Sequence, residues 1–187
     1  MTTVSPELDR RFRDAAAREQ LLDVAYDFVD SPVGRLLVAA SERGLCRIVY
    51  DAEPEHELDR LSHAFGVRVL RSALPIDAAK RQLDEYFDGT RRHFELPLDV
   101  ALLADFNRRV LGELARVPYG EVVTYGELAV RAARPRAARA VGMVMNRNPL
   151  PIVLPCHRVV GANGKLVGYA GGLERKEALL RLEGALL

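Results

Sequence analysis

A cysteine and a histidine stand side by side in the segment Pro155-Cys156-His157-Arg158-Val159, directly after the apolar run 151–154. A free cysteine has a pKa of about 8.5 and is only a few per cent thiolate at pH 7, so a nucleophilic cysteine needs a basic or positively charged neighbour. His157 is the obvious base. A thiol in so apolar a segment can equally be an inert core residue, and the pair alone leaves both interpretations open.

Transfer of a proton from Cys156 to His157 needs a further group between the two side chains. Adjacent residues on a helical turn do not face each other, so we expect a bridging water rather than direct contact between Cys156 and His157. A further group must then orient the imidazole. Glu183 is our candidate, because the C-terminal helix that carries it has apolar positions that must pack back onto the domain. Taken singly, the three residues also fit a buried cysteine, a core histidine and a solvated glutamate.

The composition is that of an ordinary globular protein. With 187 residues, 49% of them hydrophobic, the chain can bury one core or two small ones. Its two cysteines, Cys46 and Cys156, form no zinc-ligand spacing and no disulfide framework. Residues 1–20 are highly charged, unlike a signal peptide or a membrane-spanning segment. We therefore expect a cytoplasmic protein that needs no metal or cofactor and binds no membrane, with Cys46 as plain core.

Charge is distributed unequally along the chain. Residues 1–106 hold 14 Lys and Arg against 20 Asp and Glu, a balance of −6, whereas residues 107–187 hold 13 against 6, a balance of +7. The basic second half is the candidate for binding a polyanion. Segregation of charge by chance between two solvated surfaces is the alternative.

The first half has the pattern of a sheet with helices. Ser5-Pro6 can begin a charged helix that reaches toward Gln20. Alternating apolar residues and turn signals between Val24 and Tyr50 predict an antiparallel meander. Helical spacing follows at 58–65 and 76–87, with a short extended stretch at 67–70 between them. A link at 97–99 leads to the second half.

The second half is predicted to be mostly helical. An apolar stripe over 103–114 predicts one helix, which ends at the turn 117–120. Thr124 and Glu127 have the spacing of a capping box, so Thr124 should begin a helix that runs to about Ala133. Pro135 is placed to begin another helix, ending before Asn148-Pro149. Two short helices joined by a tight turn predict a helix-turn-helix.

The second of these helices combines small residues with positive charge. Its surface is kept thin by Ala137, Ala138, Ala140 and Gly142, and five arginines crowd the motif: Arg131, Arg134, Arg136, Arg139 and Arg147. A thin, basic helix can approach the minor groove of DNA, which is only about 6 Å wide and offers a degenerate code. Close packing of an Ala-rich helix against a neighbour is the alternative.

Taken together, these motifs closely resemble the O6-alkylguanine-DNA alkyltransferases. The resemblance rests on the ordered segments 117–125, 137–142, 148–152 and 155–160, and it covers residues 103–187 densely and 24–89 loosely. It implies an α+β chain in two parts. Residues 23–98 would form a ribonuclease H-like antiparallel β-sheet with helices, and residues 99–187 a winged-helix or helix-turn-helix-like domain that binds DNA and accepts the alkyl group. Residues 1–22 would be an N-terminal extension without an assigned counterpart.

The resemblance also implies roles for the reactive residues. Cys156 would be the alkyl acceptor, His157 its water-linked base, and Glu183 the group that orients His157. Tyr125 would protonate guanine N3 as the base leaves, and Asn148 would brace the turn before the active site. The implied DNA-binding residues are Arg136, Ala138, Arg139, Ala140 and Tyr125, of which Arg139 would replace the extruded nucleotide in the stack. The implied base pocket comprises Met145, Val159, Tyr169, Ala170 and Gly171.

The function implied is direct reversal of DNA damage. One alkyl group would pass irreversibly from O6 of guanine, with O4 of thymine as a further candidate, to Cys156 after the base flips out of the duplex. The partner would be double-stranded DNA, and the protein would be a monomer in solution that requires no other protein and associates with the nucleoid while bound to DNA. Two alternatives are a cysteine hydrolase using Cys156, His157 and Glu183, and a non-catalytic protein that senses alkyl lesions; a lesion sensor would carry another residue in place of Cys156. The Cys/His zinc set of some family members is absent from the N-terminal part.

Overall fold

The computed structural model describes residues 5–186 and divides into two compact units. The first runs to Glu85 and includes 95–99, whereas the second holds 86–94 and the chain from Val100 onward. The first unit carries a sheet and the second is mostly helical, which confirms the predicted α+β class. The expected domain limits after residues 22 and 98 stay a prediction. Within residues 5–186, no helix has both the length and the apolar character needed to cross a bilayer.

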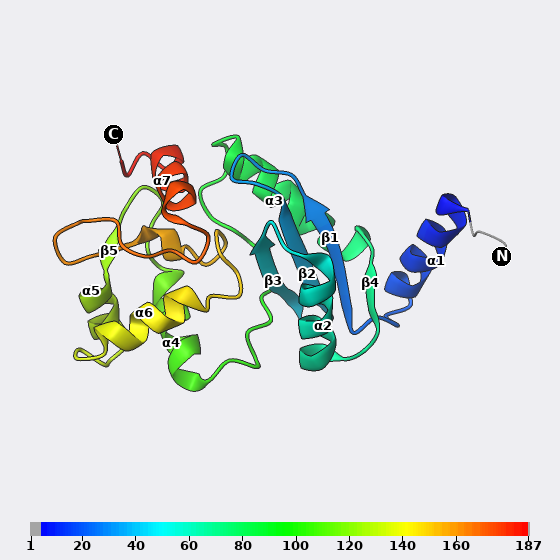
Figure 1. The fold of residues 1–187 in the computed structure, drawn as a ribbon, viewed down its shortest axis with the longest axis horizontal. Helices are drawn as coiled ribbons and strands as arrows, with labels where there is room; N and C mark the ends of the chain where they lie inside the picture. Colours follow the sequence, from blue (N-terminus) through cyan, green and yellow to red (C-terminus); the bar gives the residue numbers. More distant parts are fainter. Residues whose placement is uncertain (1–4, 187) are drawn as a thin grey trace. The chain divides into compact units, whose positions relative to one another are not determined.

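The sheet of the first unit is mixed rather than purely antiparallel (Figure 1). The predicted meander is present as β1 (Val24–Val29), β2 (Leu36–Ser41) and β3 (Gly44–Tyr50), with each strand antiparallel to the next. A fourth strand, β4 (Val69–Arg71), lies beside β1 and runs parallel to it. The parallel pairing arises because helix α2 (Pro54–Phe65) forms the long crossover connection that parallel strands require.

Helices complete the core of this unit. Leu61 of α2 packs with Val24, Leu37 and Cys46 on one face of the sheet. The short helix η1 (Leu74–Ile76) lies against β1 and β2 and leads into α3. The N-terminal segment forms α1, at whose start the Ser5 hydroxyl accepts a hydrogen bond from the Leu8 amide at 3.2 Å. The remaining helices of this part are α1 (Pro6–Arg18) and α3 (Asp77–Phe87). Burial, together with the charge of Asp99, raises the pKa of the Cys46 thiol to about 12, as befits a core residue.

The second unit builds a helical layer around a two-stranded sheet. Its elements are α4 (Asp105–Leu114), β5 (Val123–Thr124), α5 (Tyr125–Arg131), α6 (Ala138–Asn146), η2 (Cys156–Arg158), β6 (Val159–Val160) and α7 (Leu173–Leu182). Strands β5 and β6 are parallel, with Val123 opposite Val159. This pairing joins the start of α5 to the segment that directly follows Cys156.

The helix-turn-helix begins as expected and differs at its turn. The Thr124 hydroxyl accepts a hydrogen bond from the Glu127 amide at 3.1 Å, and the Thr124 amide donates to the Glu127 carboxylate at 2.7 Å, which confirms the capping box. The expectation that Pro135 begins the second helix is wrong, because α6 begins at Ala138. The Ala137 amide donates to the Arg134 carbonyl at 2.9 Å, so Pro135 occupies the second position of a β-turn, where its fixed φ is favourable.

Loss of the Thr124 cap should destabilise the second unit, because this cap begins helix α5, of which Tyr125 is the first residue. Thr124→Ala removes the oxygen that accepts from Glu127, and we expect the free energy of unfolding to fall by about 1 kcal/mol in urea titrations. Thr124→Ser keeps the oxygen and serves as the matched control, with stability close to that of the wild type. Equal stability of the alanine and serine variants would contradict this assignment.

Candidate active site

Cys156 lies in a buried segment that Asn148 holds in place. The Asn148 side-chain amide donates to the Leu154 carbonyl at 2.7 Å and to Cys156 Sγ at 3.1 Å, and its oxygen accepts from the Leu150 amide at 3.0 Å. Ile152, inside this turn, has a φ of 74°, a left-handed conformation that is unfavourable for a β-branched residue. Asn148 therefore fixes both a strained turn and the thiol that follows it, in line with its predicted bracing role.

The environment of Cys156 keeps the sulfur protonated at neutral pH. Burial raises the pKa of the thiol, and hydrogen bonds from Asn148 and Tyr169, together with the positive charge of Lys176, offset only part of that effect. Nucleophilic attack by this sulfur therefore requires a base that removes its proton.

His157 is fully buried and has one ring nitrogen available for that purpose. Its Nε2 lies 2.9 Å from Glu183 Oε1, whereas Nδ1 is the one buried side-chain nitrogen or oxygen in residues 5–186 without a hydrogen-bond partner. Burial, together with the positive charges of Arg158 and Lys176, lowers the pKa of His157 despite the opposing effect of Glu183. The imidazole is therefore neutral at pH 7. With its proton on Nε2, as the carboxylate requires, Nδ1 is an acceptor.

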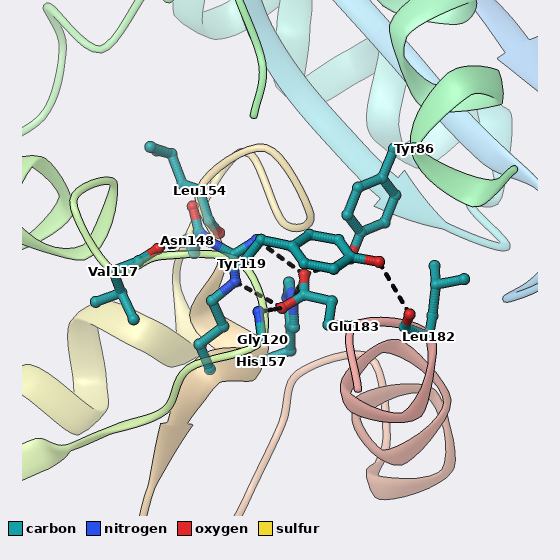
Figure 2. Close-up of polar contacts among 10 residues, drawn as sticks. Tyr86, Val117, Tyr119, Gly120, Asn148, Leu154, His157, Leu182 and Glu183 are labelled. Atoms are coloured by element: carbon teal, nitrogen blue, oxygen red, sulfur yellow. Dashed lines mark hydrogen bonds and ion pairs between the residues drawn. The ribbon is translucent and has the colours of Figure 1, made fainter. Parts of the chain in front are cut away.

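The Glu183 carboxylate is the centre of the polar network (Figure 2). Its side chain is inaccessible to solvent and accepts five hydrogen bonds, in addition to closing α7 as its C-cap. Oε1 accepts from His157 Nε2, from the Tyr86 hydroxyl at 2.6 Å and from Arg158 Nη2 at 2.8 Å. Oε2 accepts from Arg158 Nε at 2.8 Å and from the Gly120 amide at 3.3 Å.

These donors decide the ionisation of Glu183. Burial alone would raise its pKa, but hydrogen bonds from His157 and Arg158, and the charge of the guanidinium, lower the pKa to about 2. The carboxylate is thus ionised at every pH at which the protein would work. Tyr86, whose pKa is raised by burial and by Glu183, remains a neutral donor to it.

Three residues of this network were not anticipated as part of the site: Tyr86, Arg158 and Lys176. The Arg158 guanidinium reaches the Val117 carbonyl at 2.6 Å besides its two bonds to Glu183. Lys176 is fully buried, its ammonium donates to the carbonyls of Val159 at 2.6 Å and Val167 at 2.8 Å, and burial lowers its pKa to about 8.

A signal for Lys176 is present in the pattern of the last helix. Positions 176, 179, 180 and 183 follow helical spacing and form its buried face, so Lys176 and Glu183 are charged residues on an otherwise apolar stripe. A buried charge almost always has a partner, so both positions mark a polar site. Tyr86 gives no such signal, because an aromatic residue at a core-facing helical position is ordinary.

The helix-turn-helix brings one further predicted residue toward the thiol. Tyr125 is half-buried at the first position of α5, and burial together with the nearby Cys156 raises the pKa of its phenol, which remains protonated. Helix α6 passes close to it, since a Cβ at Gly142 would lie 3.8 Å from the Tyr125 ring, an ordinary van der Waals distance. Arg136 and Arg139 are exposed around the start of α6. The small residues predicted beside them, Ala138 and Ala140, are half-buried on the same helix.

The predicted base pocket comes from three elements. Met145 on α6 and Val159 on β6 are buried, whereas the others lie in the loop before α7: Tyr169 and Gly171 are half-buried and Ala170 is exposed. Tyr169 was expected in this pocket, and its side chain in addition hydrogen-bonds Cys156. Among residues 5–186 no three His, Cys, Asp or Glu side chains gather to hold a metal ion. Base binding by these residues stays a prediction.

The sequence and the fold are similar to those of known DNA-repair proteins. Two family models match, 6-O-methylguanine DNA methyltransferase, ribonuclease-like domain, over residues 24–100 and 6-O-methylguanine DNA methyltransferase, DNA binding domain, over residues 105–185. A methylated-DNA–protein-cysteine methyltransferase of Methanosarcina barkeri is 42% identical over 162 residues, which cover 84% of this chain and 96% of that protein.

Solved structures agree with these matches. The crystal structure of Mycobacterium tuberculosis O6-methylguanine methyltransferase is similar with a TM-score of 0.74 and 39% identity, covering 87% of this chain and 93% of that one. The Mycobacterium tuberculosis protein in complex with DNA gives a TM-score of 0.75 and 38% identity, with coverage of 86% and 93%.

The buried ion pair of Arg158 with Glu183 should dominate the stability of the second unit. Arg158→Met leaves the carboxylate without its guanidinium, and we expect the free energy of unfolding at pH 7 to fall by about 3–5 kcal/mol. Arg181→Met is the control, because the ion pair of Arg181 with Glu177 is exposed and its loss should cost less than about 0.5 kcal/mol. Similar losses for the two variants would contradict the role given to Arg158.

The same pair predicts a pH dependence. In the wild type the pKa of Glu183 is about 2, against 4.5 for an ordinary glutamate, so its stabilisation is present above pH 4.5 and is lost as the pH falls toward 2. Arg158→Met raises the pKa of Glu183 in the folded state, so the variant no longer loses this stabilisation as the pH falls. The stability difference between wild type and variant should therefore narrow as urea titrations are repeated from pH 4.5 downward, and a constant difference would contradict the assignment.

Proposed function

Because this chain belongs to the O6-methylguanine DNA methyltransferase family, whose members are methylated-DNA–protein-cysteine methyltransferases acting in DNA repair, we propose that Cys156 is its alkyl acceptor. The observation that carries the proposal is the chain of contacts around the sulfur. Asn148 holds the buried thiol, and the adjacent His157 is backed by Glu183 and presents an unpartnered Nδ1. This is the arrangement of an activated nucleophile rather than of an inert core cysteine.

Activation begins with the thiol proton. His157 Nδ1 accepts it through one bridging water, which leaves Cys156 as a thiolate and His157 as an imidazolium. Glu183, already ionised, stabilises that imidazolium through the Nε2 hydrogen bond and holds the ring in the tautomer that leaves Nδ1 free. Lys176 contributes positive charge near the sulfur as the thiolate forms.

Transfer is then a displacement at saturated carbon. The Cys156 sulfur forms a bond to the alkyl carbon, the bond from that carbon to guanine O6 breaks, and the electron pair of the broken bond passes to the purine. Tyr125 donates its phenolic proton to guanine N3 as this charge develops. The product is a thioether, which offers water no electrophilic carbonyl. Each protein molecule therefore acts once.

DNA reaches the thiol through the helix-turn-helix. The partner is double-stranded DNA with an alkylated guanine, the protein is a monomer in solution that requires no other protein, and we place this action on nucleoid DNA in the cytoplasm. Ala138 and Ala140 allow α6 to enter the minor groove, Arg136 contacts the backbone, and Arg139 fills the gap left by the flipped base. Extrusion costs a few kcal/mol, which Arg139 partly offsets.

The extruded base needs a pocket beside the sulfur. Met145 and Tyr169 form its walls, and backbone groups at Val159, Ala170 and Gly171 hold guanine. The basic charge of residues 107–187 and the exposure of Arg136 and Arg139 support this mode of binding. An alkyl group on O4 of thymine is a further candidate substrate for the same pocket.

Cys156→Ser should abolish transfer while DNA binding survives. Wild-type protein incubated with duplex DNA carrying labelled O6-methylguanine should become labelled to one equivalent on the peptide that contains Cys156. The serine variant should take up no label and should bind the same duplex with unchanged affinity, because the charge and fold of the α5–α6 motif are untouched. Electrophoretic mobility shifts and mass spectrometry measure the two properties.

The same assay separates the alternatives. A cysteine hydrolase would release label catalytically, and a lesion-sensing protein would bind the duplex without taking up label. An unlabelled Cys156 in the wild type would overturn the proposal, and loss of binding in Cys156→Ser would contradict the separation of chemistry from DNA binding.

Alanine substitutions of Arg139 and Arg136 should have different effects on DNA binding. With 2-aminopurine as a reporter of unstacking, Arg139→Ala should lower base extrusion more than overall affinity. Arg136→Ala should weaken binding to all sequences and lower the slope of log affinity against log salt by about 1. Equal loss of affinity for flipped and unmodified DNA in Arg139→Ala would contradict the stack-filling role.

A further inference from the structure

The hydroxyl of Tyr86 contacts the carboxylate that backs His157. Tyr86 lies in the last turn of α3, within the residues that the ribonuclease-like family model matches, yet it packs with the second unit. Its side chain is fully buried, and its ring lies 5.4 Å from the ring of Phe94 and 6.1 Å from that of Tyr119, measured between centroids. Its hydroxyl is 2.6 Å from Glu183 Oε1 (Figure 2).

Glu183 Oε1 is shared among three donors. The Tyr86 hydroxyl, His157 Nε2 and Arg158 Nη2 all point at this one oxygen. Each donor withdraws electron density from the oxygen, so each weakens the bonds that the other two can make. A hydrogen bond to an ionised group is stronger than one between neutral groups. Loss of the Tyr86 hydroxyl should therefore strengthen the bond between Glu183 Oε1 and His157 Nε2.

We infer that Tyr86 is a positioning residue for alkyl transfer, whose hydroxyl orients Glu183 and limits how strongly this carboxylate stabilises protonated His157. Tyr86 thereby sets the lowest pH at which His157 can accept the thiol proton. The inference rests on the proposed function, because it requires His157 to act as the base.

The acid side of the pH–rate profile reports on His157 alone. The charged groups that surround His157 are Lys176 on α7, Glu183 at the C-cap of α7, and Arg158 on η2. The pKa of Glu183 is about 2 and that of Lys176 is about 8, and Arg158 stays cationic. Tyr86, Tyr119 and Cys156 all have raised pKa values, and Arg92, over the Tyr119 ring, is a permanent cation. His157, whose pKa burial lowers below its ordinary value, is the remaining group in this set that gains a proton on the acid side of neutrality.

Tyr86→Phe tests the inference in the full-length protein. Single-turnover methyl transfer from labelled duplex DNA is measured from pH 4.5 to pH 8. Without the hydroxyl, Glu183 stabilises the imidazolium more strongly, so the midpoint of the acid limb should move up by about 0.5–1 pH unit. Below the wild-type midpoint, transfer should fall roughly three- to tenfold relative to wild type, while transfer at pH 8 stays within about twofold. A purely structural loss would lower the rate by the same factor at every pH.

Tyr119→Phe is the matched control. The Tyr119 hydroxyl donates to the Leu182 carbonyl at 2.9 Å, so it belongs to the same cluster without touching the Glu183 carboxylate. This variant should lose a comparable amount of stability and keep the wild-type midpoint.

A second variant keeps the inference testable if Tyr86→Phe folds poorly. Site-specific Tyr86→3-fluorotyrosine retains the hydroxyl and nearly the same size but donates a stronger hydrogen bond. It should move the midpoint in the opposite direction, to lower pH.

Three outcomes would overturn the role of Tyr86: an unchanged midpoint in Tyr86→Phe, a uniform loss of rate at all pH values, or an equal shift in Tyr119→Phe. An unlabelled Cys156 in the wild type would instead overturn the proposed function. The two failures are therefore distinguishable in one set of measurements.

Discussion

A carboxylate removed from water must receive hydrogen bonds from the protein on all sides, and Glu183 imposes this requirement on the second unit. Its donors come from the end of α3, from the turn after α4 and from η2. Leaving such a charge partly unpaired would cost several kcal/mol, so these segments must converge where α7 ends. The geometry around Cys156 and His157 follows from that convergence, because both residues belong to η2.

The same charge balance allows a buried thiol to be stable at rest and, in the proposed reaction, to become a nucleophile. Arg158 already neutralises Glu183, so His157 remains an uncharged imidazole with a free Nδ1. Burial holds Cys156 in its protonated form. In the proposed reaction a proton moves within this network from sulfur to imidazole, and the charge that appears on His157 faces a carboxylate that is already in place. Little reorganisation is then needed at the moment of transfer.

In the proposed reaction, DNA binding and chemistry meet at Tyr125. Tyr125 is the first residue of α5, which the Thr124 cap holds, and it lies close enough to Cys156 for that group to raise the pKa of the phenol. The parallel pairing of β5 with β6 connects this helix start to η2. A base delivered by the α5–α6 motif would therefore arrive beside the sulfur, so the fold itself couples recognition to transfer.

The sequence by itself determined the features that depend on near neighbours: the meander between Val24 and Tyr50, the capping box at Thr124 and the cysteine–histidine pair. Glu183 was also predicted as a candidate, because the C-terminal helix that carries it must pack back onto the domain. Only the tertiary structure decided the parallel place of β4, the start of α6 at Ala138, and the convergence of Tyr86, Arg158 and Lys176 on the site. These features depend on contacts between distant segments, such as the 97 positions between Tyr86 and Glu183. Local periodicity cannot encode which buried donor meets which acceptor, because that choice follows from the packing of the whole unit.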